Sequence, residues 1–335
     1  MRALEIQSYG LDGLAFAERA EPVPGPGEVL VRMRAVTLNY RDLLTVSGQY
    51  GGAYTLPIVP FSDGCGIVEA VGPGVTTLAV GDRVTSLFFA EHWQAGPPTP
   101  AKLRALGGPR DGCGQELLAI SEQGVVKTLD YLTDEQAAAL PCAGLTAWRA
   151  LVVDGAVKAG DVVVLQGTGG VSIFALQFAR ALGCETIITS SSDEKLSRAK
   201  ELGAHHVINY RTNPDWSKEV RRITGGRGAD LVVEVGGAKT LIESLKSIRQ
   251  QGHVAIIGVL SGFAEPLPIG MLVWTSARVQ GLSVGSRENF EDMLRAMALH
   301  RIAPVIDRTF SIDEAHAALK LMQAGGHFGK IALCF

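Results

Sequence analysis

The chain has 335 residues, enough for about two domains, with 19% charged residues, 47% hydrophobic residues and a formal net charge of −3. This small net charge gives no electrostatic attraction to nucleic acid or to a membrane surface, so we expect neither partner. No run of 18 apolar residues occurs, and charged residues interrupt the N-terminal segment. The sequence therefore predicts neither a membrane span nor a signal peptide. The five cysteines form no C-x-x-C pair, which favours the cytoplasm over an oxidising compartment.

The N-terminal part of the chain, to about residue 120, has the pattern of a β-rich domain. Alternating apolar residues and flanking turns predict strands at Glu28–Asn39, Cys65–Gly72 and Asp82–Phe89. Residues 94–114 contain several glycines and prolines, and we expect an irregular loop there.

From Thr133 onward the pattern becomes helical and then alternates between strands and helices. Thr133 is a candidate N-cap with acidic residues in the turn that follows it. Short apolar runs predict strands at Val162–Leu165, Thr186–Thr189, Val207–Asn209, Leu231–Val235 and Val254–Gly258. Helical spacing predicts helices at Val171–Leu182, Asp193–Leu202, Trp216–Thr224 and Lys239–Gln250. This alternation predicts an α/β fold with a doubly wound parallel sheet.

The segment from Val162 to Gly183 combines a strand, a glycine turn and a helix. Read as G-x-G-x-x-G, it contains Gly167 and Gly169, with Ser172 at the third position, which serves helix–strand packing. Glycines let the backbone approach a ligand closely, and the helix N-terminus favours negative charge. We therefore predict that a dinucleotide pyrophosphate binds at Gly167, Thr168, Gly169, Gly170 and Val171.

Several segments together resemble the medium-chain dehydrogenase/reductase superfamily. They are Pro22–Met33, Val68–Val84, Leu140–Leu151, Gln166–Ala179, Arg198–Arg211 and Gly325–Ile331. The resemblance covers nearly the whole chain. It implies a GroES-like β-barrel catalytic domain at residues 1–126, a Rossmann domain at 127–265, a return to the catalytic domain at 266–335, and an active site between the two domains.

The chain departs from the zinc alcohol dehydrogenases of that superfamily at their metal ligands. Asn39 aligns with the first cysteine ligand of the catalytic zinc and Ser62 with its histidine, so that Cys142 alone remains. Cys113 stands alone where those enzymes have a four-cysteine zinc loop. We therefore expect no zinc, and the resemblance narrows to zinc-free quinone oxidoreductases and enoyl reductases.

Two candidate catalytic residues follow from this narrower resemblance. The segment Leu38–Tyr50 resembles the N-x-x-D…G-x-Y pattern of the zinc-free enzymes. We predict that Tyr50 donates a hydrogen bond or proton to the developing anion and that Asn39 orients cofactor or substrate. Asp42 is expected to be structural, and the sequence does not decide whether Arg41 faces the substrate.

The predicted cofactor is NADPH rather than NADH. Ser190 stands where NAD enzymes have the acidic residue that binds the ribose and would repel a 2′-phosphate. Lys195 and Tyr210 could complete a phosphate site with Ser190 and Ser191. The alternative is that these serines only cap the next helix. The resemblance implies further cofactor contacts at Thr146, Gly258, Val259, Leu260 and Lys330.

These observations predict an NADPH-dependent reductase of quinones or α,β-unsaturated carbonyls. Its substrate would be a small hydrophobic electron acceptor, and pairing of the strand within Ala277–Val284 would form a homodimer. Two alternatives remain: an alcohol dehydrogenase-like enzyme that works without zinc, and a non-catalytic NADPH-binding protein.

Overall fold

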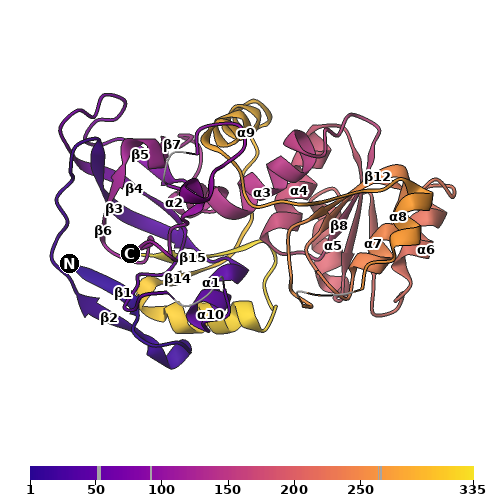
Figure 1. Ribbon diagram of the computed structural model, residues 1–335, viewed down its shortest axis with the longest axis horizontal. Helices are drawn as coiled ribbons and strands as arrows, with labels where there is room; N and C mark the ends of the chain where they lie inside the picture. The colour runs from indigo at the N-terminus through magenta and orange to yellow at the C-terminus, as the bar shows by residue number, and fades with distance from the viewer. Residues whose placement is uncertain (51–53, 91–92, 263, 265) are drawn as a thin grey trace. The chain divides into compact units, whose positions relative to one another are not determined.

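The strands of the computed structural model form a two-stranded, a six-stranded and a seven-stranded sheet (Figure 1). The structure describes residues 1–50, 54–90, 93–262, 264 and 266–335. The chain divides into two units. The first comprises Met1–Leu145 and Ser286–Phe335, and the second comprises Thr146–Gly285.

The first unit contains the seven-stranded sheet, in the order β14-β15-β3-β4-β5-β7, with β6 also paired to β3, and the two-stranded sheet β1-β2. Its strands are β1 (Arg2–Ile6), β2 (Leu14–Glu18), β3 (Glu28–Thr37), β4 (Asp63–Val71), β5 (Arg83–Ser86), β6 (Leu117–Ser121), β7 (Val125–Lys127), β14 (Ile306–Ser311) and β15 (Lys330–Cys334). Its α-helices are α1 (Tyr40–Val46), α2 (Asp134–Ala138), α9 (Arg287–His300) and α10 (Ala315–Gln323). Short helical turns lie at η1 (Leu11–Gly13), η2 (Pro100–Leu103), η3 (Glu122–Gly124), η4 (Leu140–Gly144) and η6 (Ile312–Glu314).

Alternation along β3 explains the core of the first unit. Val29, Val31 and Met33 are buried, whereas Arg32 and Arg34, between and after them, are exposed, as expected for a strand with one face on the core. The helix predicted after Thr133 is confirmed as α2. The Thr133 hydroxyl accepts a hydrogen bond from the Gln136 N–H (3.3 Å), and the Gln136 side chain accepts one from the Thr133 N–H (3.1 Å).

The second unit contains the predicted doubly wound parallel sheet, in the order β10-β9-β8-β11-β12-β13. Its strands are β8 (Val162–Gln166), β9 (Glu185–Ser190), β10 (His206–Asn209), β11 (Ala229–Glu234), β12 (Ile248–Ile256) and β13 (Arg278–Gly281). Helix α3 (Leu145–Trp148) begins at the last residue of the first unit and continues into the second. The other helices of the second unit are η5 (Arg149–Val153), α4 (Gly170–Ala181), α5 (Asp193–Glu201), α6 (Trp216–Ile223), α7 (Leu241–Ser247) and α8 (Ile269–Thr275). All neighbouring strands run parallel. From β8 the chain first adds β9 and β10 on one side and then returns to add β11, β12 and β13 on the other. This reversal of strand order between β8 and β11 is the arrangement of a Rossmann fold.

Burial on both faces accounts for the apolar runs of this sheet. Every residue of β8 and of β11 is buried. Helices α4 and α5 pack on β8, β9 and β10, whereas α7 and α8 pack on β11 and β12 (Figure 1). Because right-handed crossovers change faces where the strand order reverses, the carboxyl ends of β8 and β11 form the place at which such sheets bind ligands.

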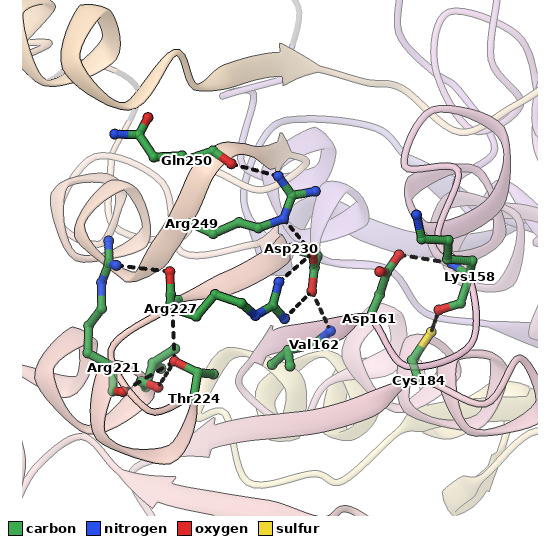
Figure 2. A network of polar contacts seen from close by, with 12 residues as sticks. Lys158, Asp161, Val162, Cys184, Arg221, Thr224, Arg227, Asp230, Arg249 and Gln250 are labelled. Carbon is green, nitrogen blue, oxygen red and sulfur yellow. Dashed lines mark hydrogen bonds and ion pairs between the residues drawn. The ribbon is translucent and has the colours of Figure 1, made fainter.

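The amino ends of the same two strands are joined by Asp230 (Figure 2). Its carboxylate accepts two hydrogen bonds from Arg227 (2.9 and 2.6 Å), one from Arg249 and one from the Val162 N–H (2.7 Å). Burial alone would raise the pKa of Asp230, but the two guanidinium groups outweigh it and lower that pKa below its usual value. This network fixes the end of the sheet opposite the predicted cofactor site.

The boundaries between the two units differ from those predicted at 126/127 and 265/266. Helix α2 packs against β3 and β4 of the first unit, so the first boundary lies after Leu145. Strand β13 pairs with β12 and extends the parallel sheet, so the second boundary lies after Gly285. Glu265, the predicted end of the second domain, lies outside the described residues.

Candidate functional site

The loop before α1 and the start of β15 bring a buried polar cluster together in the first unit. The Lys330 ammonium donates hydrogen bonds to Asn39 Oδ1 (2.6 Å) and to the Leu38 carbonyl (2.7 Å). Its nitrogen lies 3.9 Å from Asp63 Oδ2. The side chains of Lys330 and Asp63 are 3% and 0% exposed, so both charges are compensated inside the unit.

Asn39 links this lysine to the serine that follows Phe61. The Asn39 amide nitrogen donates to Ser62 Oγ (3.3 Å), and the Ser62 hydroxyl donates to Asp63 Oδ1 (2.7 Å). Phe61 has a φ of 71°, a left-handed conformation that costs energy in a residue with a side chain. Asn39, which the sequence predicts to orient a ligand, therefore has both ends of its amide engaged within the cluster.

Lys330 is predicted from the sequence as a cofactor contact, whereas its ammonium is buried in the first unit. Two of its hydrogen bonds go to Leu38 and Asn39. In this structure Lys330 therefore orients Asn39 and balances the charge of Asp63.

These residues do not fit a zinc ion. The oxygen of Asn39 already accepts a hydrogen bond from an ammonium, and that positive charge would repel a dication. Burial, followed by the Asp63 carboxylate, raises the pKa of the Cys142 thiol well above its usual value. Among the described residues, no three His, Cys, Asp or Glu side chains are grouped to hold a metal.

Asp42 and Arg41, on the first turn of α1, are buried beside this cluster. The Asn39 N–H donates to Asp42 Oδ2 (2.8 Å), so Asp42 caps the helix, in agreement with its predicted structural role. Burial raises the pKa of Asp42 to about 6, although the Arg41 charge opposes the shift.

Tyr50, the predicted proton donor, lies over the guanidinium of Arg41. The Arg41 carbon Cζ is 4.9 Å from the centre of the Tyr50 ring, and Tyr50 is half-buried. Arg41 is 7% exposed and donates to two backbone carbonyls, those of Leu106 (2.9 Å) and Gly108 (3.1 Å). Arg41 thus points into the interior of the unit and contacts the Tyr50 ring, and whether it faces the substrate stays open.

The predicted phosphate-binding turn of the second unit lies between β8 and α4. Gly167 has a φ of 70°, and a Cβ added at Gly167 or Gly169 would meet no described atom within 4 Å. Helix α4 begins at Gly170 and has no acidic residue in its first turn. Its first N–H groups have no partner within the helix, so this turn, which includes Thr168 and Val171, fits a phosphate.

Ser172, at the third fingerprint position, closes the helix onto the strand. Its hydroxyl donates to the Gln166 carbonyl at 2.5 Å. A serine here therefore supplies the close packing for which the fingerprint uses glycine.

The residues predicted to discriminate NADPH from NADH gather where β9 and β10 end. Ser190 ends β9, and its carbonyl accepts a hydrogen bond from the Tyr210 N–H (3.1 Å) just after β10. Ser192 caps α5 by accepting from the Lys195 N–H (3.3 Å), and Ser191 lies between the two. The helix-capping alternative therefore holds for Ser192, whereas phosphate binding by Ser190, Ser191, Lys195 and Tyr210 stays a prediction.

Glu234, which sequence analysis missed, organises the carboxyl end of β11. Its Oε1 accepts hydrogen bonds from the N–H groups of Gly236 (2.8 Å) and Gly237 (2.9 Å) and from the Thr240 hydroxyl (2.6 Å). Its Oε2 accepts from Gln166 (2.7 Å), at the end of β8, and from Ser244. The signal was present in the sequence as a lone acidic residue that ends an apolar strand before two glycines.

The remaining predicted cofactor contacts are in the second unit but lie apart in the chain. Thr146 is buried in α3, at 3% exposure. Gly258, Val259 and Leu260 follow β12, and a Cβ at Gly258 would lie 2.1 Å from the Val235 carbonyl oxygen. Glycine is thus required for this loop to pack against the one that Glu234 orders.

Comparison with known proteins agrees with this architecture. Residues 25–130 match the alcohol dehydrogenase GroES-like domain, and residues 170–298 match the zinc-binding dehydrogenase domain. A zinc-type alcohol dehydrogenase-like protein of Schizosaccharomyces pombe is 42% identical over 97% of this chain and 96% of its own. A structure from Sinorhizobium meliloti, provisionally described as an alcohol dehydrogenase, is 43% identical with a TM-score of 0.93, covering 100% and 98% of the two chains.

Other relatives are named for several different cofactors and substrates. A 2-haloacrylate reductase of Burkholderia is 34% identical, over 99% of this chain and 98% of its own. A mycobacterial protein solved with NADPH has a TM-score of 0.85 at 30% identity, and an NAD-dependent alcohol dehydrogenase has 0.92 at 34%. A quinone oxidoreductase of Pseudomonas syringae has a TM-score of 0.85 at 30% identity. These three structures each cover 100% of this chain, which in turn covers at least 99% of each of theirs.

No helix among the described residues is both long and apolar enough to cross a membrane. The GroES-like domain, the parallel Rossmann sheet and the full-length similarity to dehydrogenases and reductases lead to one assignment. The chain is an oxidoreductase of the medium-chain dehydrogenase/reductase superfamily.

Proposed function

We propose that this oxidoreductase uses NADPH and no zinc to reduce an activated acceptor, a quinone or an α,β-unsaturated carbonyl. The observation that carries the proposal is the cluster in the first unit. Two of the positions that align with zinc ligands are Asn39 and Ser62, and Asn39 Oδ1 accepts a hydrogen bond from the Lys330 ammonium.

The chemistry of the acceptor follows from this lack of suitable metal ligands. In zinc alcohol dehydrogenases the metal acts as the Lewis acid that polarises an unactivated carbonyl, and the described residues of this chain lack suitable ligands for it. A conjugated acceptor instead spreads the new charge onto its oxygen, where hydrogen-bond donors stabilise it. The bound nicotinamide supplies the hydride. Tyr50 donates the hydrogen bond or proton to the developing anion, and Asn39, held by Lys330, fixes the loop before α1.

The residues after β9 support NADPH. The structure has serines, and no carboxylate, at positions 190 and 191, with Lys195 on the next helix. A serine does not repel a 2′-phosphate, and a lysine attracts one. The mycobacterial relative solved with NADPH supports the same choice. The NAD-dependent relative is the reason to measure both cofactors.

The names of the relatives support both candidate acceptor classes. The 2-haloacrylate reductase acts on a conjugated acid, and the quinone oxidoreductase on quinones. We propose a small hydrophobic acceptor and a homodimer formed through β13, which is an edge strand of the parallel sheet. Residence in the cytoplasm remains a prediction from the sequence.

The test is a turnover assay that follows the absorbance of NADPH or NADH with quinones, enones and an enoyl thioester. A secondary alcohol with oxidised cofactor is the control for alcohol dehydrogenase activity. We expect turnover with NADPH and a conjugated acceptor, and about a hundredfold lower kcat in Tyr50→Phe at unchanged NADPH affinity. Turnover of the alcohol alone would support the zinc-free alcohol dehydrogenase alternative. Tight NADPH binding without any turnover would support the non-catalytic one.

A further inference from the structure

Arg41 makes contacts that the proposed function has not used. Its guanidinium lies below the Tyr50 ring, 4.9 Å from the ring centre, and 5.1 Å from the centre of the Phe88 ring. We infer that Arg41 is a positioning residue that holds the Tyr50 ring and strengthens its phenol as a donor. This inference rests on the proposed function, because it concerns how Tyr50 performs its step.

Backbone carbonyl groups hold the Arg41 guanidinium in place. One terminal nitrogen donates to the Leu106 carbonyl at 2.9 Å, and the other donates to the Gly108 carbonyl at 3.1 Å. The Asp42 carboxylate lies 3.5 Å from the first of these nitrogens. Arg41 is thus tied to the loop after η2 and to its own helix, so it can hold a half-buried ring in place.

An arginine is suited to this position in a way that a lysine is not. Its flat guanidinium can satisfy two carbonyls in its plane and still present a face to an aromatic ring. An ammonium is a point charge without such a face. A cation at the face of a phenol also stabilises negative charge that develops on the ring oxygen. This favours donation of a hydrogen bond or proton by Tyr50.

One nitrogen of the Arg41 guanidinium group, Nε, is buried and has no hydrogen-bond partner among the described residues in this geometry. A buried donor without a partner is costly, and a purely structural arginine would be expected to satisfy it. The contacts of the guanidinium are thus the two carbonyls, the Tyr50 and Phe88 rings and the nearby Tyr54 phenol.

The test combines Arg41→Met and Arg41→Lys with Tyr50→Phe in a double-mutant cycle. Arg83 provides the control, since it is in the same unit, donates to the Leu129 carbonyl (2.8 Å) and pairs with Asp134 (3.3 Å). We expect Arg41→Met to lower kcat about tenfold at unchanged NADPH affinity, and to have no further effect once Tyr50 is Phe. Arg41→Lys should recover only part of the loss, and Arg83→Met should leave kcat unchanged.

A second measurement needs no acceptor. Protein labelled with 3-fluorotyrosine gives a fluorine signal for Tyr50, assigned by its loss in Tyr50→Phe. We expect this signal to shift or broaden in Arg41→Met and Arg41→Lys but to be unchanged in Arg83→Met. An unmoved Tyr50 signal in both Arg41 variants would overturn the inference even if the variants lose activity.

The outcomes separate the two proposals. Full turnover of Tyr50→Phe would remove the role proposed for Tyr50, whatever Arg41 does. Loss of turnover in Tyr50→Phe, with a further independent loss on adding Arg41→Met, would leave the proposed function standing and contradict the positioning role.

Discussion

Asp63 in the first unit and Glu234 in the second are both fully buried carboxylates, but their surroundings differ. Asp63 lies 3.9 Å from the ammonium of Lys330 and accepts hydrogen bonds from Ser62 and from the Cys142 N–H. Glu234 accepts five hydrogen bonds from neutral donors. The Asp63 charge is balanced by the charge of Lys330, whereas the Glu234 carboxylate is stabilised by neutral hydrogen-bond donors.

The two clusters should therefore respond differently to a substitution that removes one partner of the carboxylate. A buried ion pair fails when either partner is removed, because the remaining charge has no water to solvate it. A carboxylate held by several neutral donors loses only part of its solvation when one contact changes. We therefore expect larger and more specific effects from single substitutions in the first cluster than in the second.

The largest effect is expected for Lys330→Met. It removes the cation beside Asp63 and one hydrogen bond to Asn39. Burial already raises the pKa of Asp63, against the effect of this ammonium. We expect the free energy of unfolding in urea at pH 7 to fall by about 3 kcal/mol. The loss should shrink at acidic pH, where Asp63 becomes protonated.

The double variant Lys330→Met with Asp63→Asn is the matched control. If the unpaired charge causes the loss, the double variant should be more stable than Lys330→Met alone. Equal stability of the single and double variants would show that the packing of the lysine chain, and not its charge, explains the effect.

A smaller effect is expected for Glu234→Gln. The glutamine keeps one oxygen for the donors of the Gly236 loop, but its amide group would face donors from Gln166 and Ser244. We expect a loss of about 2 kcal/mol in unfolding free energy, with weaker NADPH binding because the loop after β11 loosens. Thr240→Val, which removes one neutral donor, should cost less. A wild-type NADPH affinity in Glu234→Gln would show that this loop does not contribute to cofactor binding.

The smallest expected effect is a pH dependence at Asp42. Its pKa is about 6 in the folded protein, above its usual value of 3.8, because of burial. The folded state therefore binds this proton more tightly than the unfolded state, and the resulting stabilisation is present below pH 4 and is lost as the pH rises through 6. We expect Asp42→Asn to gain stability relative to the wild type, by about 1 to 2 kcal/mol, between pH 4 and pH 7.

Urea unfolding of both proteins across that pH range measures this difference. His253 in the second unit sharpens the comparison, because burial, and then the Arg278 charge, lowers its pKa to about 4. Its contribution has the opposite sign and is lost as the pH falls from 6.5 toward 4. A difference between Asp42→Asn and the wild type that does not change with pH would contradict the assignment.

Features set by neighbouring residues could be predicted from the sequence. The strand, the glycine turn and helix α4 follow from residues within a single stretch, and the cap at Thr133 needs only Gln136, three positions on. Their physical causes are local backbone conformation and periodic burial. The ends of the two compact units, at Leu145 and Gly285, depend on packing of α2 on β3 and β4 and on pairing of β13 with β12, which are tertiary interactions.

The chemistry of the first cluster could not be predicted in the same way. Asn39 and Ser62 were identified as positions without zinc ligands, but Lys330 lies almost 300 positions along the chain from Asn39. Nothing local to Lys330 predicts that its charge is buried, since an exposed lysine in a loop has the same sequence pattern. Glu234 was missed for the opposite reason. All its donors except Gln166 are within ten positions in the chain, but a single acidic residue at a strand end usually faces solvent.

The most direct test is the metal content of the active protein. Purified enzyme would be analysed for zinc, and NADPH turnover with the best conjugated acceptor would be measured before and after chelation. Asn39 and Ser62 at the ligand positions, with the Lys330 ammonium beside Asn39, predict zinc well below stoichiometric amounts and unchanged turnover. One tightly bound zinc per chain, with turnover abolished by chelation and restored by zinc, would contradict it.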